Sequence, residues 1–236
     1  MNEQTKKEIL KIVAQSYQCF ADQTKSLKEK ILWPELIKIA GSIETGNILD
    51  VGCGNGRIYK LFKDKDIHYV GVDSCEKILE AARQNATDAK HEPEFVLGNI
   101  LELNFIPQVN FDYLFCIDVL HHLPDKRLRL DAMRQLKNKV RPGGEIIITV
   151  WNLWKQPEYK KLIIKFLLLK LFKKNKMDYW DILVDYKNQK NNNYYKNYYH
   201  AFTAHELKQL VKQSGLKIKG FYKDKKTYYL MLIKPV

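Results

Sequence analysis

Three glycines, Gly52, Gly54 and Gly56, fall within five consecutive positions of the stretch LDVGCGNG. They end a short apolar run over 47–52, which predicts a buried strand, and precede apolar residues at helical spacing, which predict a helix over 56–64. Glycine adopts positive φ at little steric cost and lets a ligand approach the backbone closely. The N–H groups at the start of a helix favour an anionic or polar ligand group. A tight turn without a ligand needs one glycine, so three favour a ligand site.

Two acidic residues narrow the choice of ligand. The glycine spacing is G-x-G-x-G after Asp50, whereas a dinucleotide fingerprint needs a glycine where Arg57 stands. The segment HYVGVDSC predicts a second strand that ends in Asp73, 23 residues after Asp50. An acid at that exposed strand end can accept hydrogen bonds from both hydroxyls of a ribose. As a plain alternative, Asp73 or Ser74 caps the following helix.

The pair LDVGCGNG and HYVGVDSC resembles the first two motifs of class I S-adenosylmethionine-dependent methyltransferases. The resemblance implies a Rossmann-like α/β fold, with helices on both faces of a seven-stranded, mostly parallel sheet whose last hairpin makes one strand antiparallel. It implies S-adenosyl-L-methionine as cofactor and S-adenosyl-L-homocysteine as product. The cofactor-binding residues implied are Asp50, Gly52, Cys53, Gly54, Gly56, Asp73, Ser74, Asn99, Ile100, Ile117 and His122.

Asn99 departs from this family pattern. It lies in FVLGNILEL, where the family usually carries an acid that receives the adenine amino group. The amide oxygen of Asn99 can still accept that bond, while Ile100 packs the ring. A surface asparagine in a turn is an equally simple reading of the same position.

The order of elements also fits alternating strands and helices. Strands are predicted at 47–52, 68–73, 94–97, 112–117, 145–151, 217–222 and 227–233, and helices at 56–64, 76–86, 126–139 and 203–214. We expect a single methyltransferase domain with an N-terminal helical cap (1–45), a cofactor-binding core (46–151), an irregular basic and aromatic substrate or lid segment (152–200), and a C-terminal helix and β-hairpin (201–236).

The segment FDYLFCIDVLHHLPD places three polar side chains after a buried strand: Asp118, His121 and His122. Open α/β sheets bind ligands at the carboxyl ends of their strands, so we expect these side chains to shape the methyl-transfer pocket. A structural hydrogen-bonding role suits each histidine taken alone.

Two later stretches, DYWDILVDYK and NYYHAFTAHELKQLV, resemble motifs of the wobble-uridine tRNA methyltransferases. That family forms a methyl ester on 5-carboxymethyluridine in the anticodon loop. The resemblance implies that Tyr199 and His200 hold the uridine side chain, and that the partners are the tRNA anticodon loop and a small zinc-binding activator subunit. Asn197 and Lys25 stand where the family has arginines, and Asp185-Tyr186 replace Pro-Trp. Neither lysine nor asparagine reproduces the bidentate grip of a guanidinium.

Charge favours a polyanionic partner. The chain carries 40 Lys and Arg against 27 Asp and Glu, a net charge of +13. Lysines bind phosphates, and aromatic rings can stack on splayed bases. The resemblance to the tRNA methyltransferases implies that this partner is RNA, and we expect no DNA partner. A solvated, lysine-rich loop is the plain alternative. The substrate-binding residues expected on these grounds and from the resemblance are Lys25, Trp33, Trp151, Lys173, Lys174, Lys176, Tyr199 and His200.

The apolar stretch LIIKFLLLKLF at 162–172 has two readings. It is too short to span a bilayer, which needs about 20 residues. A lid helix over the core is favoured, and a basic helix lying on a membrane surface comes second. The cysteines lie far apart, which predicts reduced thiols, no metal site and a cytoplasmic protein. The N-terminus has acids and no apolar signal segment.

These expectations combine into a tRNA methyltransferase that acts on a carboxylate. A carboxylate is already ionised at neutral pH, so no strong general base is required, and catalysis comes mainly from positioning. Two alternatives stay open. One is a small-molecule class I O-methyltransferase in which the basic segment is only a lid, and the other is a catalytically silent RNA-binding subunit that keeps the cofactor fold.

Overall fold

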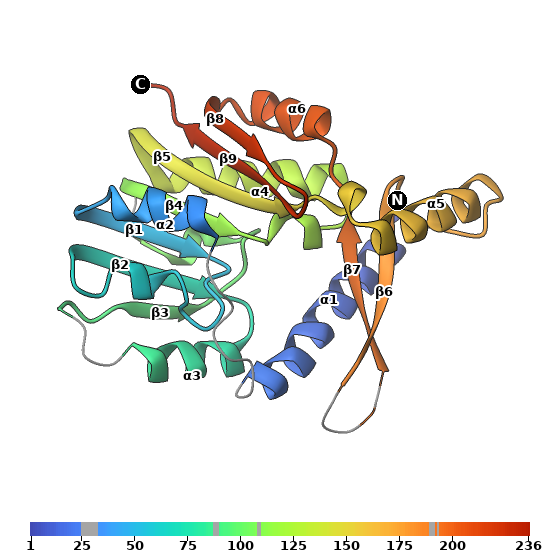
Figure 1. Ribbon diagram of the computed structural model, residues 1–236, viewed down its shortest axis with the longest axis horizontal. Coiled ribbons are helices and arrows are strands. Elements are labelled where there is room, and N and C mark those ends of the chain that lie inside the picture. The colour runs from blue at the N-terminus through green and yellow to red at the C-terminus, as the bar shows by residue number, and fades with distance from the viewer. Residues whose placement is uncertain (25–32, 87–89, 108–109, 189–191, 193) are drawn as a thin grey trace.

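Seven strands form one sheet in the order β3-β2-β1-β4-β5-β9-β8 (Figure 1). The computed structural model describes residues 1–24, 33–86, 90–107, 110–188, 192 and 194–236. The strands of this sheet are β1 (Thr45–Val51), β2 (Asp66–Asp73), β3 (Glu94–Leu97), β4 (Phe111–Ile117), β5 (Val140–Trp151), β8 (Lys217–Lys223) and β9 (Thr227–Ile233). The strands from β3 to β5 are parallel, and β9 runs antiparallel to both β5 and β8. The expected seven-stranded, mostly parallel sheet is confirmed.

The strand order reverses between β1 and β4. From β1 the chain first builds outwards through β2 and β3, and then returns to add β4 on the other side of β1. In open α/β sheets, ligands bind outside the carboxyl ends of the strands at such a switch point. The glycine turn after β1 and Asp118 after β4 therefore lie where a ligand is expected.

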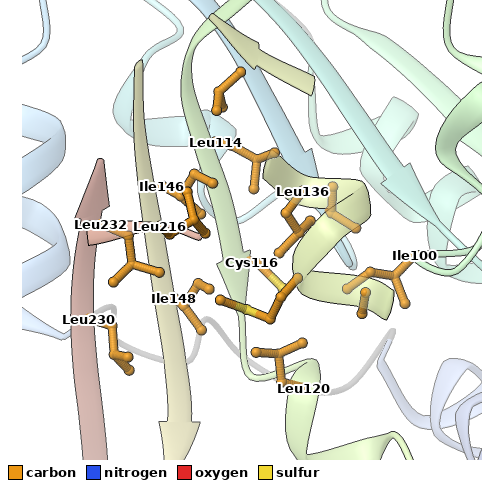
Figure 2. Packing of buried hydrophobic residues seen from close by; sticks show 14 of the residues in the cluster. Ile100, Leu114, Cys116, Leu120, Leu136, Ile146, Ile148, Leu216, Leu230 and Leu232 are labelled. Carbon is orange, nitrogen blue, oxygen red and sulfur yellow. The ribbon is translucent and has the colours of Figure 1, made fainter. Parts of the chain in front are cut away.

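Helices cover both faces of the sheet because its central strands are apolar on both sides. In β1, Leu49 and Val51 pack into the larger core cluster, while Ile48 packs into the smaller one. Figure 2 shows the larger cluster, in which Leu136 lies against Leu114. The helices are α1 (Glu3–Thr24), α2 (Pro34–Gly41), α3 (Glu76–Asn85), α4 (Lys126–Lys139), α5 (Pro157–Leu171) and α6 (Ala204–Ser214).

The helix expected over 56–64 is wrong. Turns follow β1 instead, with a single 3-10 turn at Tyr59–Leu61. Gly54 and Gly56 both have positive φ, at 57° and 76°, and this conformation does not start an α-helix. Ile58 and Phe62 are buried in the smaller core cluster all the same, so their spacing reflects one buried face rather than a helix.

The segment expected to be irregular holds a second, two-stranded sheet. Strands β6 (Asp181–Lys187) and β7 (Tyr194–His200) pair antiparallel, and α1 packs along β7. Figure 1 shows this hairpin projecting beside α1, away from the main sheet. Ile9 of α1, Met177 and Tyr198 form a small core of their own, which accounts for the order in this stretch.

Helix α5 does not cover either of the two large clusters. Its buried Ile163 packs into a separate aromatic cluster with Leu153, Ile182 and Tyr199. The expectation of a lid over the main core is corrected accordingly. Among the described residues, no helix combines the length and the apolar content that crossing a membrane requires.

Gly52 provides a test of the turn geometry. Its φ is +79°, and an added Cβ would lie 2.2 Å from Cγ2 of Val119, whereas a Cβ on Gly54 (φ +57°) meets open space. We expect Gly52→Ala to lower the free energy of unfolding by about 2–4 kcal/mol and Gly54→Ala by about 1 kcal/mol, measured by urea unfolding. Adding Val119→Ala to Gly52→Ala should restore the part of the unfolding free energy that is lost to the clash with Val119. Equal losses of unfolding free energy in Gly52→Ala and Gly54→Ala would contradict this geometry.

Candidate functional site

Asp73 fastens the glycine turn to the end of β2. Its Oδ2 accepts from the N–H of Gly54 at 2.9 Å, and its Oδ1 accepts from the N–H of Cys75 at 3.0 Å. The residue is 8% exposed, so the expected exposed strand end is wrong. Burial raises the pKa of Asp73, although the surrounding backbone N–H groups oppose this. The N–H of Ser74 also bonds to this carboxylate, and the acceptor capacity that remains can serve a ribose hydroxyl.

Asp50 lies completely buried beneath the same turn. Its Oδ2 accepts from the hydroxyl of Tyr69 at 2.5 Å, and its Oδ1 has no hydrogen-bond partner in the described part of the chain. Burial raises the pKa of Asp50 to about 7, while the Tyr69 hydroxyl and the Arg57 charge act to lower it. A buried acceptor without a partner calls for a ligand donor or a water.

A cavity of about 350 Å³ lies beyond the ends of β2 and β3. Its walls are formed by Ser74, Leu97, Gly98, Asn99, Glu102 and Phe105. Leu97 is 53% and Phe105 43% exposed, so two apolar side chains remain uncovered next to polar ones. A flat apolar ring with polar edges fits this lining.

Asn99 lines this cavity, so its contact to the adenine stays a prediction, whereas Ile100 is placed differently from expectation. Oδ1 of Asn99 accepts from the N–H of Leu101 at 3.0 Å, the local turn contact that served as the plain alternative. The side chain of Ile100 packs into the larger core cluster and is not among the residues that line the cavity. Ile117 likewise lies in the smaller core cluster.

Four aromatic rings meet beyond β4 and β5, and we name them the aromatic box: His121, His122, Trp151 and Tyr199. Trp151 and Tyr199 are stacked, with ring centroids 5.1 Å apart and planes at 18°. The His121 ring lies 4.4 Å from that of His122 and 5.5 Å from that of Trp151. Strand β7 of the second sheet brings Tyr199 to the carboxyl ends of the first sheet.

Both histidines of the box are neutral. Burial lowers the pKa of His122 to about 4 and that of His121 well below its ordinary value. Nδ1 of His122 lies 3.1 Å from the carbonyl oxygen of Tyr198, so that nitrogen donates. Nδ1 of His121 accepts from the N–H of Trp151 at 3.4 Å. The hydrogen of neutral His121 is therefore on Nε2, which is buried without a partner in the described part of the chain.

The hydroxyl group of Tyr199 belongs to a small hydrogen-bonded group of polar side chains. Its hydroxyl lies 3.1 Å from that of Tyr186, which lies 3.4 Å from that of Tyr159. Nδ2 of Asn197 donates to the Tyr199 hydroxyl at 3.2 Å. Burial raises the pKa of Tyr199, so the phenol keeps its proton. Helix α1 adds Tyr17, whose ring lies edge-on to His122 at 5.2 Å.

His200 lies outside the box and has a structural environment. Its Nδ1 is 2.7 Å from Oδ1 of Asp181, and its Nε2 is 2.9 Å from Oε1 of Glu206. Arg129 of α4 lies 3.6 Å from the same Glu206 oxygen. Both ring nitrogens therefore face carboxylates of the chain itself. We reassign His200 from holding a substrate to tying β7 to α6, because neither nitrogen remains for a ligand.

Asp118 is fixed at the end of β4 between two partners. Its Oδ1 accepts from the Thr149 hydroxyl at 2.8 Å, and its Oδ2 lies 3.7 Å from Nη2 of Arg57. Its φ is +62°, which is uncommon for a residue other than glycine.

The expected substrate residues do not gather in one place. Trp151 and Tyr199 belong to the aromatic box, whereas Trp33 begins α2 and lies under the guanidinium of Arg57. The exposed residues Lys173, Lys174 and Lys176 follow α5 at its end furthest from the main sheet (Figure 1). Lys25 lies outside the described residues.

Sequence reasoning missed several polar groups near the site. Tyr159 and Tyr186 join Tyr199 only because β6, β7 and α5 pack together, and nothing local in the sequence indicates this. Arg57 had a usable signal, since it follows the last glycine of the turn directly. Among the described residues, no group of three or more His, Cys, Asp or Glu side chains is placed to hold a metal ion.

Known proteins resemble this chain in sequence and in fold. The methyltransferase domain family model matches residues 48–144. The solved structure of a SAM-dependent methyltransferase from Methanosarcina mazei superimposes with a TM-score of 0.70 and 19% identity, over 88% of this chain and 100% of the other. The chain has the class I methyltransferase fold, and its cofactor is S-adenosylmethionine.

Two curated relatives are tRNA enzymes by name. The probable tRNA methyltransferase 9B of Homo sapiens is 31% identical over 136 residues, which are 57% of this chain and 28% of the human protein. This chain therefore spans little more than a quarter of that relative. The tRNA (carboxymethyluridine(34)-5-O)-methyltransferase of Schizosaccharomyces pombe is 24% identical over 206 residues, 78% of this chain and 79% of the yeast protein.

The residues present fit S-adenosylmethionine. Gly54, where an added Cβ would meet open space, leaves room over the turn, and the unpartnered Oδ1 of Asp50 suits the ammonium group of the methionine part. Asp73 retains lone pairs for the ribose, and the cavity beside Leu97 and Phe105 suits the adenine.

His200 provides a test of the structural assignment. Removing the ring leaves the buried Asp181 carboxylate without its partner, so we expect His200→Ala to lower the free energy of unfolding by about 3–5 kcal/mol. Cofactor affinity and turnover per folded molecule should stay within a few-fold of wild type. A stable His200→Ala protein whose turnover collapses would restore the substrate role.

The pH dependence of stability supplies a second readout for this variant. Glu206 is largely buried, which raises its pKa, but the His200 hydrogen bond and charge more than offset this and hold the pKa below its ordinary 4.5. The resulting stabilisation is present above 4.5 and is lost as pH falls through the depressed folded value. Urea unfolding at pH 3–7 should show this loss in wild type and a smaller one in His200→Ala.

Proposed function

We propose that the chain transfers a methyl group from S-adenosylmethionine to the carboxylate of a carboxymethyl group on the wobble uridine of tRNA. The observation that carries the proposal is the aromatic box, with a neutral His121 whose Nε2 hydrogen has no partner in the described residues. The Schizosaccharomyces pombe relative, which matches most of this chain, is named for an enzyme that acts on this substrate, which supports the proposal.

The protonation states of the box select the nucleophile. Nε2 of His121 carries a hydrogen and Tyr199 keeps its phenol proton, so these two groups can donate to an oxygen but do not remove a proton. Nε2 of neutral His122 bears no hydrogen, but the lowered pKa of about 4 makes it a weak base. A carboxylate, with an ordinary pKa of about 4, is already ionised and needs no base. One of its oxygens forms a bond to the methyl carbon as the carbon–sulfur bond breaks, and the sulfur leaves as a neutral thioether.

Positioning and exclusion of water account for the rest of the catalysis. The rings of Trp151 and Tyr199 provide a flat apolar wall, and Thr149 holds the carboxylate of Asp118 at the end of β4. A substrate held in line with the sulfonium needs little further activation. Asp118, His121, His122 and Tyr199 are the residues that we place at the transfer step.

The charge of the chain supports a tRNA substrate. The net charge is +13, and Lys173, Lys174 and Lys176 are exposed beyond α5, where they can bind phosphates. Aromatic rings can stack on bases of an open loop. The small zinc-binding activator subunit that the sequence resemblance implies belongs to the same proposal.

One observation favours a small-molecule O-methyltransferase as the second candidate. Helix α5, after which the three lysines follow in the chain, projects away from the main sheet (Figure 1), which does not favour a basic rim around the box. In that case the α5 region would only close over a small acid.

The test is to incubate the chain with tRNA and methyl-labelled cofactor, digest the tRNA and analyse its nucleosides by mass spectrometry. We expect the label in one uridine derivative, released as methanol by mild alkali because esters hydrolyse while N-, C- and ether-linked methyl groups do not. Label that resists alkali, or no label on tRNA from a chain that binds the cofactor, would contradict the proposal.

Variants separate the box from the basic surface in the same assay. His121→Phe keeps a ring but removes the Nε2 donor, so we expect turnover to fall by about 10²–10³-fold with cofactor affinity unchanged. Replacing Lys173, Lys174 and Lys176 by glutamine should raise the KM for tRNA and leave the turnover number intact. Wild-type kinetics on tRNA from both variants would contradict the roles proposed for the aromatic box and for the three lysines.

A further inference from the structure

Arg57 places a positive charge at the switch point of the sheet. It follows Gly56 directly, and its guanidinium carbon lies 5.2 Å from the ring centroid of Trp33. Its Nη2 lies 3.7 Å from Oδ2 of Asp118. The guanidinium therefore lies between the glycine turn after β1 and the end of β4, where an open α/β sheet binds its ligand.

The two neighbours of Arg57 hold it without using up its donors. Trp33 packs against the guanidinium, and the contact to Asp118 is an ion pair too long for a hydrogen bond. No hydrogen bond to the Arg57 guanidinium is formed within the described part of the chain. A guanidinium has five N–H donors, so a full fork remains available to an incoming anion.

The position of Asp118 is itself fixed independently of Arg57. Its backbone N–H donates to the carbonyl oxygen of Thr149 at 3.0 Å, and the Thr149 hydroxyl donates to its Oδ1. These bonds keep Asp118 at a φ of +62°. A non-glycine residue held in the left-handed region indicates a position that the surrounding structure maintains for a function.

A structural salt bridge alone does not explain this arrangement. The side chains of Arg57 and Asp118 are 28% and 16% exposed, and an ion pair of this length near solvent contributes little to stability. An arginine that served only to anchor the turn would donate to a backbone carbonyl, as Arg129 does to Leu123.

The charges around the turn complement a zwitterion. The methionine part of S-adenosylmethionine carries an ammonium and a carboxylate on one carbon. The unpartnered Oδ1 of Asp50 suits the ammonium, and Arg57 is close enough for its charge to act on Asp50. A guanidinium fork matches a carboxylate in a bidentate pair.

We propose that Arg57 binds the α-carboxylate of the cofactor, and that Trp33 and Asp118 are positioning residues that hold the guanidinium over the glycine turn. This assigns Trp33 to the cofactor end of the site rather than to the substrate. It also gives a reason for the fixed position of Asp118, because its carboxylate orients the Arg57 guanidinium through the ion pair.

The test compares two ligands that differ only in the carboxylate: S-adenosylmethionine and its decarboxylated form, which keeps the adenosine, the sulfonium and the ammonium. Calorimetric titration should show that Arg57→Gln weakens binding of S-adenosylmethionine by about 10- to 100-fold. Binding of the decarboxylated ligand should stay unchanged. Arg57→Lys keeps the positive charge but cannot form the bidentate pair, so its affinity for S-adenosylmethionine should lie between those of wild type and Arg57→Gln.

Arg141→Gln is the matched control. Arg141 pairs with Asp112 at the opposite, amino end of β5, so the same change there should leave both affinities as in wild type. Thermal unfolding without ligand checks that each variant is folded. If Arg57→Gln does not fold, the two ligands are compared with Arg57→Lys instead. Equal losses for both ligands would assign Arg57 to the turn instead, and no loss for S-adenosylmethionine would equally overturn the proposal.

Discussion

The carboxylate of Asp73 joins two neighbouring strands at the point where the cofactor must lie. The N–H of Gly54 donates to one of its oxygens and the N–H of Cys75 to the other. No helix follows the glycine turn, so these bonds, together with those from Gly52 and Cys53 to the Val72 carbonyl, hold its shape. The position of Arg57 and the access to Asp50 both depend on that shape.

The second sheet completes the site from the other side. Strand β7 delivers Tyr199 to the box, and His200, the next residue, is locked between Asp181 and Glu206. Because adjacent residues of a strand point to opposite faces, the ion pairs on one face of β7 fix the aromatic ring on the other. His200 thereby helps to hold β7, and with it Tyr199, in place beside the first sheet.

Strands β1 to β4 of the main sheet were predictable from sequence because each is a short run rich in apolar residues that ends in, or is followed directly by, glycine or an acid. The helix over 56–64 failed because Ile58 and Phe62 bury one face in a turn as readily as in a helix. The β6–β7 hairpin was missed because its order comes from α1 packing on Tyr198. The role of His200 depends on Asp181 and Glu206, whose approach in space no local pattern of residues indicates.

The most direct test of this account measures the Gly54 amide and cofactor binding in one variant, Asp73→Ala. Hydrogen exchange followed by NMR should show that the Gly54 N–H is protected in the wild-type protein and exchanges freely in the variant, while amides of β4 keep their protection. Titration should show weaker binding of S-adenosylmethionine by the same variant. A Gly54 amide that stays protected, together with unchanged cofactor affinity, would contradict the central role of Asp73.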